Sequence, residues 1–299
     1  MFFDDYDTPV FRPPSEARSF ILRLTRGCAH NTCTYCAMYK GVKFQVCSDD
    51  EISTQIAMAA KVGQLYVRRI FLADGDALVL STDKLLKILA VLYKTFPNLQ
   101  RVTTYAGPLD ILHKSDEELK ALYEAGLKMA YYGMETGDSE LLKEVKKGVN
   151  QEQSIEAGQK IVRSGMKLSM MVISGLGGAT GSERHAKETA KAINAIQPNM
   201  LSALTLRLYK GTEMLAKYEG GGFELLSPWG LAKELHTMIS LLEVKPGHHI
   251  LFRSNHVSNY VPIGGTLPQD KARLLRELEE AMEQLSKLTD WDVYTNMEY

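Results

Sequence analysis

The stretch TRGCAHNTCTYCAMY occupies residues 25–39, and it contains three of the four cysteines of this 299-residue chain. The three cysteines have the spacing C-x4-C-x2-C and are Cys28, Cys33 and Cys36. Four cysteines are too few for a disulfide scaffold in a chain of this length, whereas three clustered thiols are typical of a soft-metal or redox site. The stretch therefore predicts a metal centre held by a loop.

Three cysteines are one ligand short of a structural zinc site, which four protein ligands close. An iron–sulfur cube held by three cysteines instead keeps one iron open for a small molecule. The spacing thus indicates a reactive cluster. His30 is the best candidate for a fourth ligand and Cys47 the next, so a closed zinc or electron-transfer site on a binding protein remains the alternative.

Strand and helix patterns alternate regularly through most of the chain. Capping boxes begin two of the helices, one at Ser48 with Glu51 and one at Ser115 with Glu118. Such alternation is typical of stacked βαβ units in an α/β protein with a parallel sheet. The six predicted strands are residues 20–25, 66–73, 101–106, 129–133, 167–174 and 201–208.

The alternation fades after residue 210. A helix is predicted to begin at Ser227-Pro228, a short apolar run covers residues 249–252, and an amphipathic helix is predicted over about 268–288. We expect an α-rich C-terminal extension that closes the barrel. The predicted divisions are an N-terminal extension, a core and this C-terminal extension: residues 1–17, 18–210 and 211–299.

Composition excludes several classes of protein. Hydrophobic residues make up 45% and charged residues 24%, and no apolar run approaches the roughly 18–20 residues that cross a bilayer. The acidic, proline-rich start lacks the features of a secretory signal, so a cytoplasmic location is expected. The formal net charge of −1 gives no general field for a polyanion, and nucleic acid is not favoured as a partner.

Residues able to do chemistry follow the ends of the predicted strands. In a parallel barrel all the strands end at one rim, and active sites lie there. Alone, each residue has a plainer interpretation: Gly75 as a tight turn, Asp76 as a helix cap, Glu135 as a cap near Asp138, and residues 175–178 as a flexible loop. Their joint placement favours a shared site.

These features together resemble the radical S-adenosylmethionine (SAM) superfamily, whose cluster loop follows a first strand. The resemblance covers about residues 18–210 and implies a partial (β/α)6 TIM-like barrel. The loop has one residue more between its first two cysteines than the commonest form. The segments FLADGDAL (71–78) and ETG (135–137) look most like the branch that contains oxygen-independent coproporphyrinogen dehydrogenases, Elongator catalytic subunits and methylthiotransferases.

The resemblance implies that Cys28, Cys33 and Cys36 ligate a [4Fe-4S] cluster whose open iron binds SAM. Reductive cleavage of SAM would give a 5′-deoxyadenosyl radical that abstracts hydrogen from a small or medium organic substrate. A reducing donor such as flavodoxin or ferredoxin is implied as a partner. The implied SAM contacts are Tyr35, Gly75, Asp76, Glu135, Ile173 and Gly175, together with Lys147, which stands where relatives carry arginine.

Substrate contacts are predicted from residues alone, and each has a structural alternative. Arg207 and Tyr209 end the sixth strand and could anchor an acidic or aromatic substrate, or form surface contacts. Tyr105 could line the barrel. Asn255 and His256 belong to a polar segment, residues 253–260, that is either a substrate loop or a turn-rich surface loop.

The cysteine count narrows the chemistry further. One cysteine is left after the three ligands, so a second four-cysteine cluster cannot be built. Within the superfamily that the chain resembles, the sulfur-inserting methylthiotransferases carry such an extra cluster as their sulfur source. The cysteine count therefore excludes them. An RNA-modifying member of the superfamily remains an alternative, although the composition suggests no basic stripe.

Overall fold

A computed structural model describes residues 10–288 as two compact units. Within these residues, the first unit contains the chain up to Asn31, Met38–Tyr132 and Lys160–Leu168. The second unit contains Thr32–Ala37, Gly133–Gln159 and the chain from Ser169 onward. Strand β6 (Leu127–Glu135) runs from the first unit into the second.

The first unit is built on a parallel sheet with the order β1-β4-β5-β6. Strands β1 (Phe20–Arg23) and β4 (Arg69–Ala73) are almost wholly buried, as expected of parallel strands with both faces covered. A separate antiparallel pair joins β2 (Thr25–Arg26) and β3 (Gln45–Val46). The other elements are η1 (Pro14–Glu16), α1 (Asp49–Gly63), η2 (Ala77–Val79), α2 (Thr82–Thr95), β5 (Arg101–Tyr105), α3 (Pro108–His113) and α4 (Asp116–Glu124).

The second unit continues from the end of β6 through β7 (Lys167–Ser174) and β8 (Met200–Thr205) to β9 (Ile250–Arg253) and β10 (Gly264–Leu267). Strands β7, β8 and β9 are parallel, and β10 is antiparallel to β9. The helices of the second unit are α5 (Ser139–Glu144), most of α6 (Gln151–Arg163), α7 (Gly178–Ile196), α8 (Glu213–Glu219), α9 (Pro228–Ser240) and α10 (Lys271–Leu285).

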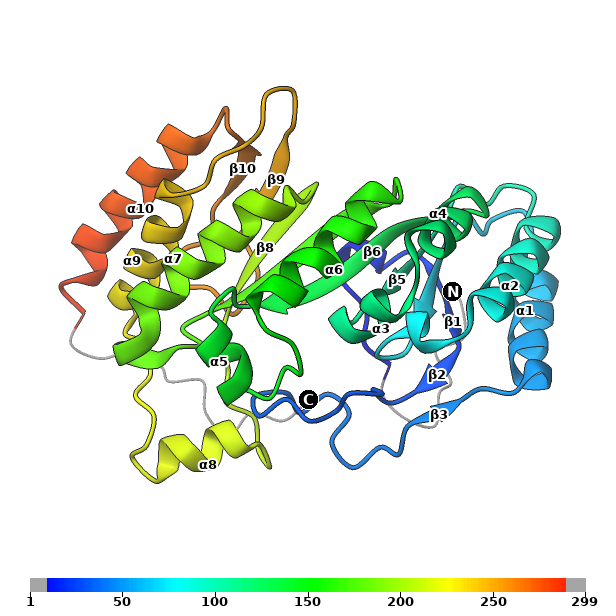
Figure 1. Ribbon diagram of the computed structural model, residues 1–299, viewed down its shortest axis with the longest axis horizontal. Coiled ribbons are helices and arrows are strands. Elements are labelled where there is room, and N and C mark those ends of the chain that lie inside the picture. Colours follow the sequence, from blue (N-terminus) through cyan, green and yellow to red (C-terminus); the bar gives the residue numbers. More distant parts are fainter. Residues whose placement is uncertain (1–9, 289–299) are drawn as a thin grey trace. The chain divides into compact units, whose positions relative to one another are not determined.

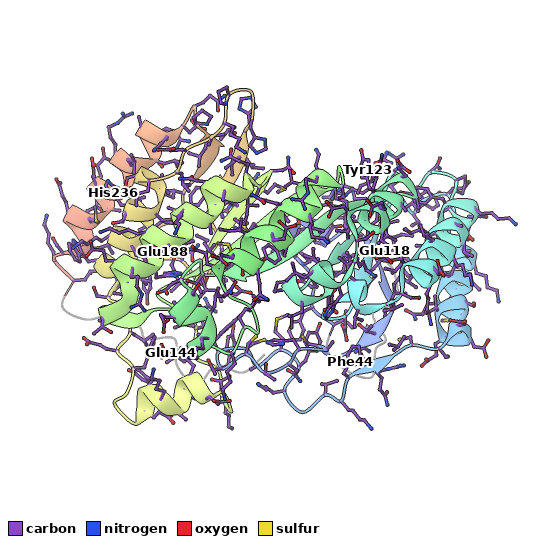
Figure 2. All side chains as sticks on the ribbon, viewed as in Figure 1. Phe44, Glu118, Tyr123, Glu144, Glu188 and His236 are labelled. Carbon is purple, nitrogen blue, oxygen red and sulfur yellow. The ribbon has the colours of Figure 1, made fainter. Side chains whose placement is uncertain are left out.

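Helices α7, α9 and α10 pack side by side in the second unit (Figure 1). On their surface His236 of α9 lies 3.1 Å from the carboxylate of Glu279 on α10, and Figure 2 labels the histidine. Glu188 of α7, also labelled there, accepts a hydrogen bond from Gln151 at 2.7 Å. None of the described helices is both long and apolar enough to span a bilayer.

The predicted α/β class and its alternation of strands and helices are confirmed. Both capping boxes form with Ser48 and Ser115 as the caps. Several boundaries were wrong. The first predicted strand is divided at Leu24, because Thr25 and Arg26 pair with β3 instead of the main sheet. Residues 66–68 precede β4, since Tyr66 closes a turn on Gly63 and is 82% exposed.

The C-terminal extension contains two strands besides its helices. The apolar run at 249–252 forms β9, and β10 was not predicted, because the sequence GGTL lacks the apolar alternation of a strand. Helix α7 begins at Gly178, in a segment whose glycines carry no helix signal. The division into residues 1–17, 18–210 and 211–299 stays a prediction; residues 1–9 and 289–299 lie outside the described residues.

Candidate functional site

In the first unit, Gly75 brings the end of β4 against the first cysteine of the loop. Its N–H donates to the carbonyl oxygen of Gly27 at 3.1 Å. A Cβ at position 75 would lie 2.8 Å from Cβ of Cys28 and 2.9 Å from its Cα, which no side chain tolerates. A glycine is therefore required at position 75 because the backbone of Gly27 and Cys28 passes so close to it, in addition to any turn that the glycine makes.

A buried ion pair fixes the same segment. Asp74 and Arg23 are 0% and 3% exposed, and Asp74 Oδ2 lies 2.8 Å from Arg23 Nη2. The carboxylate also accepts from the N–H of Gly27 at 3.2 Å and from the hydroxyl of Tyr39 at 3.2 Å. Burial raises the pKa of Asp74, while these donors act in the opposite direction. The start of the cysteine loop is thus tied to β1 and β4.

Asp76 is buried and used as a cap. Its Oδ1 accepts from the N–H of Leu78 at 2.8 Å, and its Oδ2 accepts from the N–H of Gly107. Burial, and then the negative charge of Asp110, raise the pKa of Asp76 well above its usual range. These contacts agree with the cap interpretation. A contact with the SAM ammonium stays a prediction.

In the second unit, backbone hydrogen bonds hold the loop at Thr34, which lies between the other two cysteines. The N–H of Thr34 donates to the carbonyl of Val145 at 3.1 Å, and the carbonyl of Thr34 accepts from Met214 at 3.0 Å. Tyr35 packs against the cluster of Leu141, Val145, Leu176, Leu206, Leu208, Met214 and Leu215. Burial raises the pKa of Tyr35 well above its usual range, and the nearby charges of Glu135, Cys33 and Cys36 add to this shift.

Glu135 ends β6 in a left-handed backbone conformation, with φ at +66°. Such a conformation costs free energy in a residue other than glycine, and it is frequent at functional sites. The carboxylate is buried and pairs with Lys147, with Oε1 2.9 Å from Nζ. Capping near Asp138 is not its role, because the Asp138 side chain itself accepts from Glu140 and caps α5. The ion pair places Lys147 beside Glu135, and both are predicted SAM contacts.

The backbone at the end of β7 is held by side chains from elsewhere. The carbonyl of Ile173 accepts from Nε2 of His185 at 3.1 Å, and the N–H of Gly175 donates to Glu234 at 2.7 Å. His185 lies on α7 and is buried, with 3% of its surface exposed. A helical pattern does not tell which polar residue near a helix start points inward.

The predicted substrate residues have different surroundings in the structure. The ring of Tyr105 packs edge-on against Phe71 at 5.0 Å. Arg207 donates to the carbonyl of Val257 at 3.0 Å, and the carbonyl of Tyr209 accepts from Thr212. Asn255 is exposed, as is His256, whose Nδ1 lies 2.9 Å from the Ser258 hydroxyl. Partial burial and the charge of Arg207 lower the pKa of His256.

The anchor of the polar segment is a residue that the sequence did not single out. Asn259 Oδ1 accepts from the N–H of Thr205 at 2.7 Å, and Nδ2 donates to the carbonyl of Ala203 at 2.8 Å. The segment is thereby fastened to the carboxyl end of β8. The sequence offered no signal for this, because the partners are about fifty residues apart.

The donor set suits an iron–sulfur cluster with one open iron. Cys47 is buried and lies near Arg26, with 3.6 Å between Sγ and Nη1, while the other three thiols stay in the loop. Among residues 10–288, no three Cys, His, Asp or Glu side chains form a group ready to hold a metal ion. The assignment of the ligands therefore stays a prediction.

A sequence profile described as the radical SAM superfamily matches residues 22–190, which is more than half of the chain. The chain belongs to the radical SAM superfamily. No curated protein matches it. As a member of this superfamily the protein is an enzyme, and its cofactors are a [4Fe-4S] cluster and SAM. Superfamily members in general act on small molecules with an external electron donor.

Solved structures show the same fold at low sequence identity. TsrM from Kitasatospora setae, a radical SAM methyltransferase, is 17% identical with a TM-score of 0.60, and the match covers 90% of this chain and 62% of TsrM. Methylornithine synthase (PylB) is 14% identical with a TM-score of 0.53, covering 87% and 68%. Elp3 from the archaeon Methanocaldococcus infernus is 16% identical with a TM-score of 0.52, covering 79% and 58%.

The chain therefore spans less than two thirds of TsrM and of Elp3. The expected partial barrel of the radical SAM type is confirmed by these comparisons. The branch that the sequence resembles most stays a prediction.

The buried Arg23–Asp74 pair gives a first testable outcome. We expect Asp74→Asn to lower the free energy of unfolding by about 3–5 kcal/mol, because it removes the negative charge of the buried carboxylate that the Arg23 guanidinium contacts. Denaturant titration measures this loss. Glu183→Gln, which removes one partner of an exposed pair with Lys187, is the control and should leave the transition midpoint unchanged. An unchanged midpoint for Asp74→Asn would contradict the role of the pair.

The approach of Gly75 to Cys28 gives a second. We expect Gly75→Ala to cost about 1–3 kcal/mol of stability by overpacking and to lower the iron bound per chain after anaerobic reconstitution, because the Cys28 backbone has to move. Gly181→Ala on α7 is the matched control, since a Cβ there meets nothing within 4 Å. Equal iron content in both variants would show that the contact is unimportant for the loop.

Proposed function

We propose that the protein cleaves SAM reductively at a [4Fe-4S] cluster held by Cys28, Cys33 and Cys36. The resulting 5′-deoxyadenosyl radical takes a hydrogen atom from a small or medium organic substrate. Each hydrogen abstraction takes up one electron and one SAM and gives methionine, 5′-deoxyadenosine and a substrate radical. A low-potential protein such as flavodoxin or ferredoxin supplies the electron.

The observation that carries the proposal is the anchoring of the cysteine loop. Cys28 lies against Gly75 in the first unit, and in the second unit the charges of Glu135, Cys33 and Cys36 all act on Tyr35. Gly75 and Glu135 each follow a parallel strand, at the edge where barrel enzymes place their chemistry. Each part of the loop thus has beside it a residue that the superfamily resemblance assigns to SAM.

The chain's own residues bind and orient SAM in this proposal. When bound, the cluster supplies the electron that breaks a carbon–sulfur bond. Gly75 lets the backbone approach the methionine moiety, and Asp76 accepts from its ammonium. Glu135 accepts from the polar groups of SAM, and Lys147 offers a cation to its carboxylate without the fork geometry of arginine.

Two further parts of the chain complete the proposed SAM contacts: the backbone after β7 and the side chain of Tyr35. The backbone from Ile173 to Gly178 runs along the adenine, where glycines permit close approach. Tyr35 lies beside the adenine. In the structure Tyr35 packs against a cluster of buried apolar side chains.

Single-cluster chemistry follows from the cysteines. Cys47 is the one cysteine outside the loop, and it is buried. These 299 residues therefore do not supply the ligands for an auxiliary four-cysteine cluster. This favours hydrogen abstraction followed by rearrangement, elimination or a similar step over sulfur insertion.

The test is anaerobic reconstitution, reduction with dithionite and addition of SAM. We expect wild-type protein with near-cubane iron and sulfide content to form 5′-deoxyadenosine and methionine, measured by liquid chromatography and mass spectrometry. Alanine variants of Cys28, Cys33 and Cys36 should form neither product. Cys47→Ala is the matched control and should keep most of the activity. Fully loaded wild-type protein that leaves SAM intact would overturn the proposal.

A further inference from the structure

Glu234 is a buried acid in the C-terminal extension. It lies on α9 and is 4% exposed. Its Oε1 accepts from the N–H of Gly175 at 2.7 Å, and its Oε2 accepts from the hydroxyl of Ser182 at 2.7 Å. Burying a carboxylate is costly unless it is hydrogen-bonded, and an apolar residue would pack α9 more cheaply. We therefore interpret the carboxylate as a group that holds the backbone just after β7 by its hydrogen bond with Gly175.

His185 joins this acid to the end of β6. Its Nε2 lies 3.1 Å from the carbonyl oxygen of Ile173, which can only accept, so the hydrogen bonds assign the ring proton to Nε2. Nδ1 then accepts from the hydroxyl of Thr136 at 2.7 Å. The same Nε2 is 3.7 Å from Oε1 of Glu234. Two buried side chains thus connect the residue after Glu135 with the Gly175 loop.

The Gly175 loop depends on this support for its shape. Gly175 has a φ of +83°, and a Cβ there would lie 2.9 Å from Cδ2 of Leu231, so the loop backbone packs directly on α9. Without Glu234 the N–H of Gly175 would be a buried donor with no acceptor, and its desolvation would cost free energy. Thr136 is held as well, because its hydroxyl oxygen accepts from the N–H of Asp138 at 3.0 Å.

We propose that Glu234 and His185 are positioning residues for SAM, acting through the backbone of residues 173–175 and through Thr136. The inference rests on the proposed function, which assigns these two strand ends to SAM. The C-terminal extension then contributes to the SAM site through Glu234, without any contact of its own with SAM. Loss of the support weakens SAM binding and leaves the rate at saturating SAM nearly unchanged.

Two conservative variants of Glu234 separate positioning from simple packing. Glu234→Gln keeps an oxygen that can accept from the Gly175 N–H. Glu234→Asp keeps the charge but is one methylene too short to reach it. We expect Glu234→Asp to raise the KM for SAM about tenfold, equivalent to about 1.4 kcal/mol, with kcat little changed, and Glu234→Gln to restore nearly wild-type values. Glu279→Gln, in the exposed pair with His236, is the matched control.

A readout independent of the cluster is amide hydrogen exchange of the peptide that contains Gly175. We expect faster exchange there in Glu234→Asp than in wild type, Glu234→Gln and Glu279→Gln, with the rest of α9 protected as in wild type. His185→Gln should also speed exchange at Gly175 and at the residues after Glu135, because it removes the link between the two segments.

The outcomes distinguish this inference from the proposed function. If loaded wild-type protein leaves SAM intact, the proposed function fails, and the exchange data still test the hydrogen bonds. If wild type cleaves SAM and Glu234→Asp matches it in both KM and exchange, the positioning role is overturned. A general loss of protection throughout α9, with kcat and KM both changed, would also overturn it in favour of a purely structural role.

Discussion

The close approach of Gly75 to Cys28 is the constraint on which the rest of the first unit's site depends. The residues that follow a parallel strand lie at the edge of the sheet, and after β4 these residues are Asp74, Gly75 and Asp76. Asp74 fixes the loop through Arg23 and Gly27, and Gly75 lets the cysteine backbone pass at contact distance. The loop therefore begins from a rigid base, as an oriented metal ligand requires.

The second unit meets the same requirement by other means. Glu135 keeps a strained backbone conformation and is held by Lys147, while His185 and Glu234 fasten the neighbouring strand end. Strain of this kind persists only where the surroundings over-determine it. In each unit, then, buried charges and hydrogen bonds help to define where strand ends and loop lie.

The sequence predicted what local patterns encode. The capping boxes at Ser48 and Ser115, the alternating strands and helices and the metal-binding character of the cysteine loop depend on residues close together in the chain. It could not predict pairings over long separations. The hydrogen bonds of Asp74 with Arg23, Glu234 with Gly175 and Asn259 with Thr205 span 51, 59 and 54 residues. An arginine inside an apolar first strand was the one available signal for such a pairing.

The most direct test of the account is electron–nuclear double resonance on the reduced, reconstituted enzyme, with SAM isotopically labelled at the amino nitrogen and the carboxylate oxygen of its methionine moiety. Because three cysteines leave one iron open, the account predicts hyperfine coupling from both labelled atoms to the cluster. Full cluster occupancy and bound SAM without either coupling, as a fourth protein ligand on that iron would produce, would contradict it.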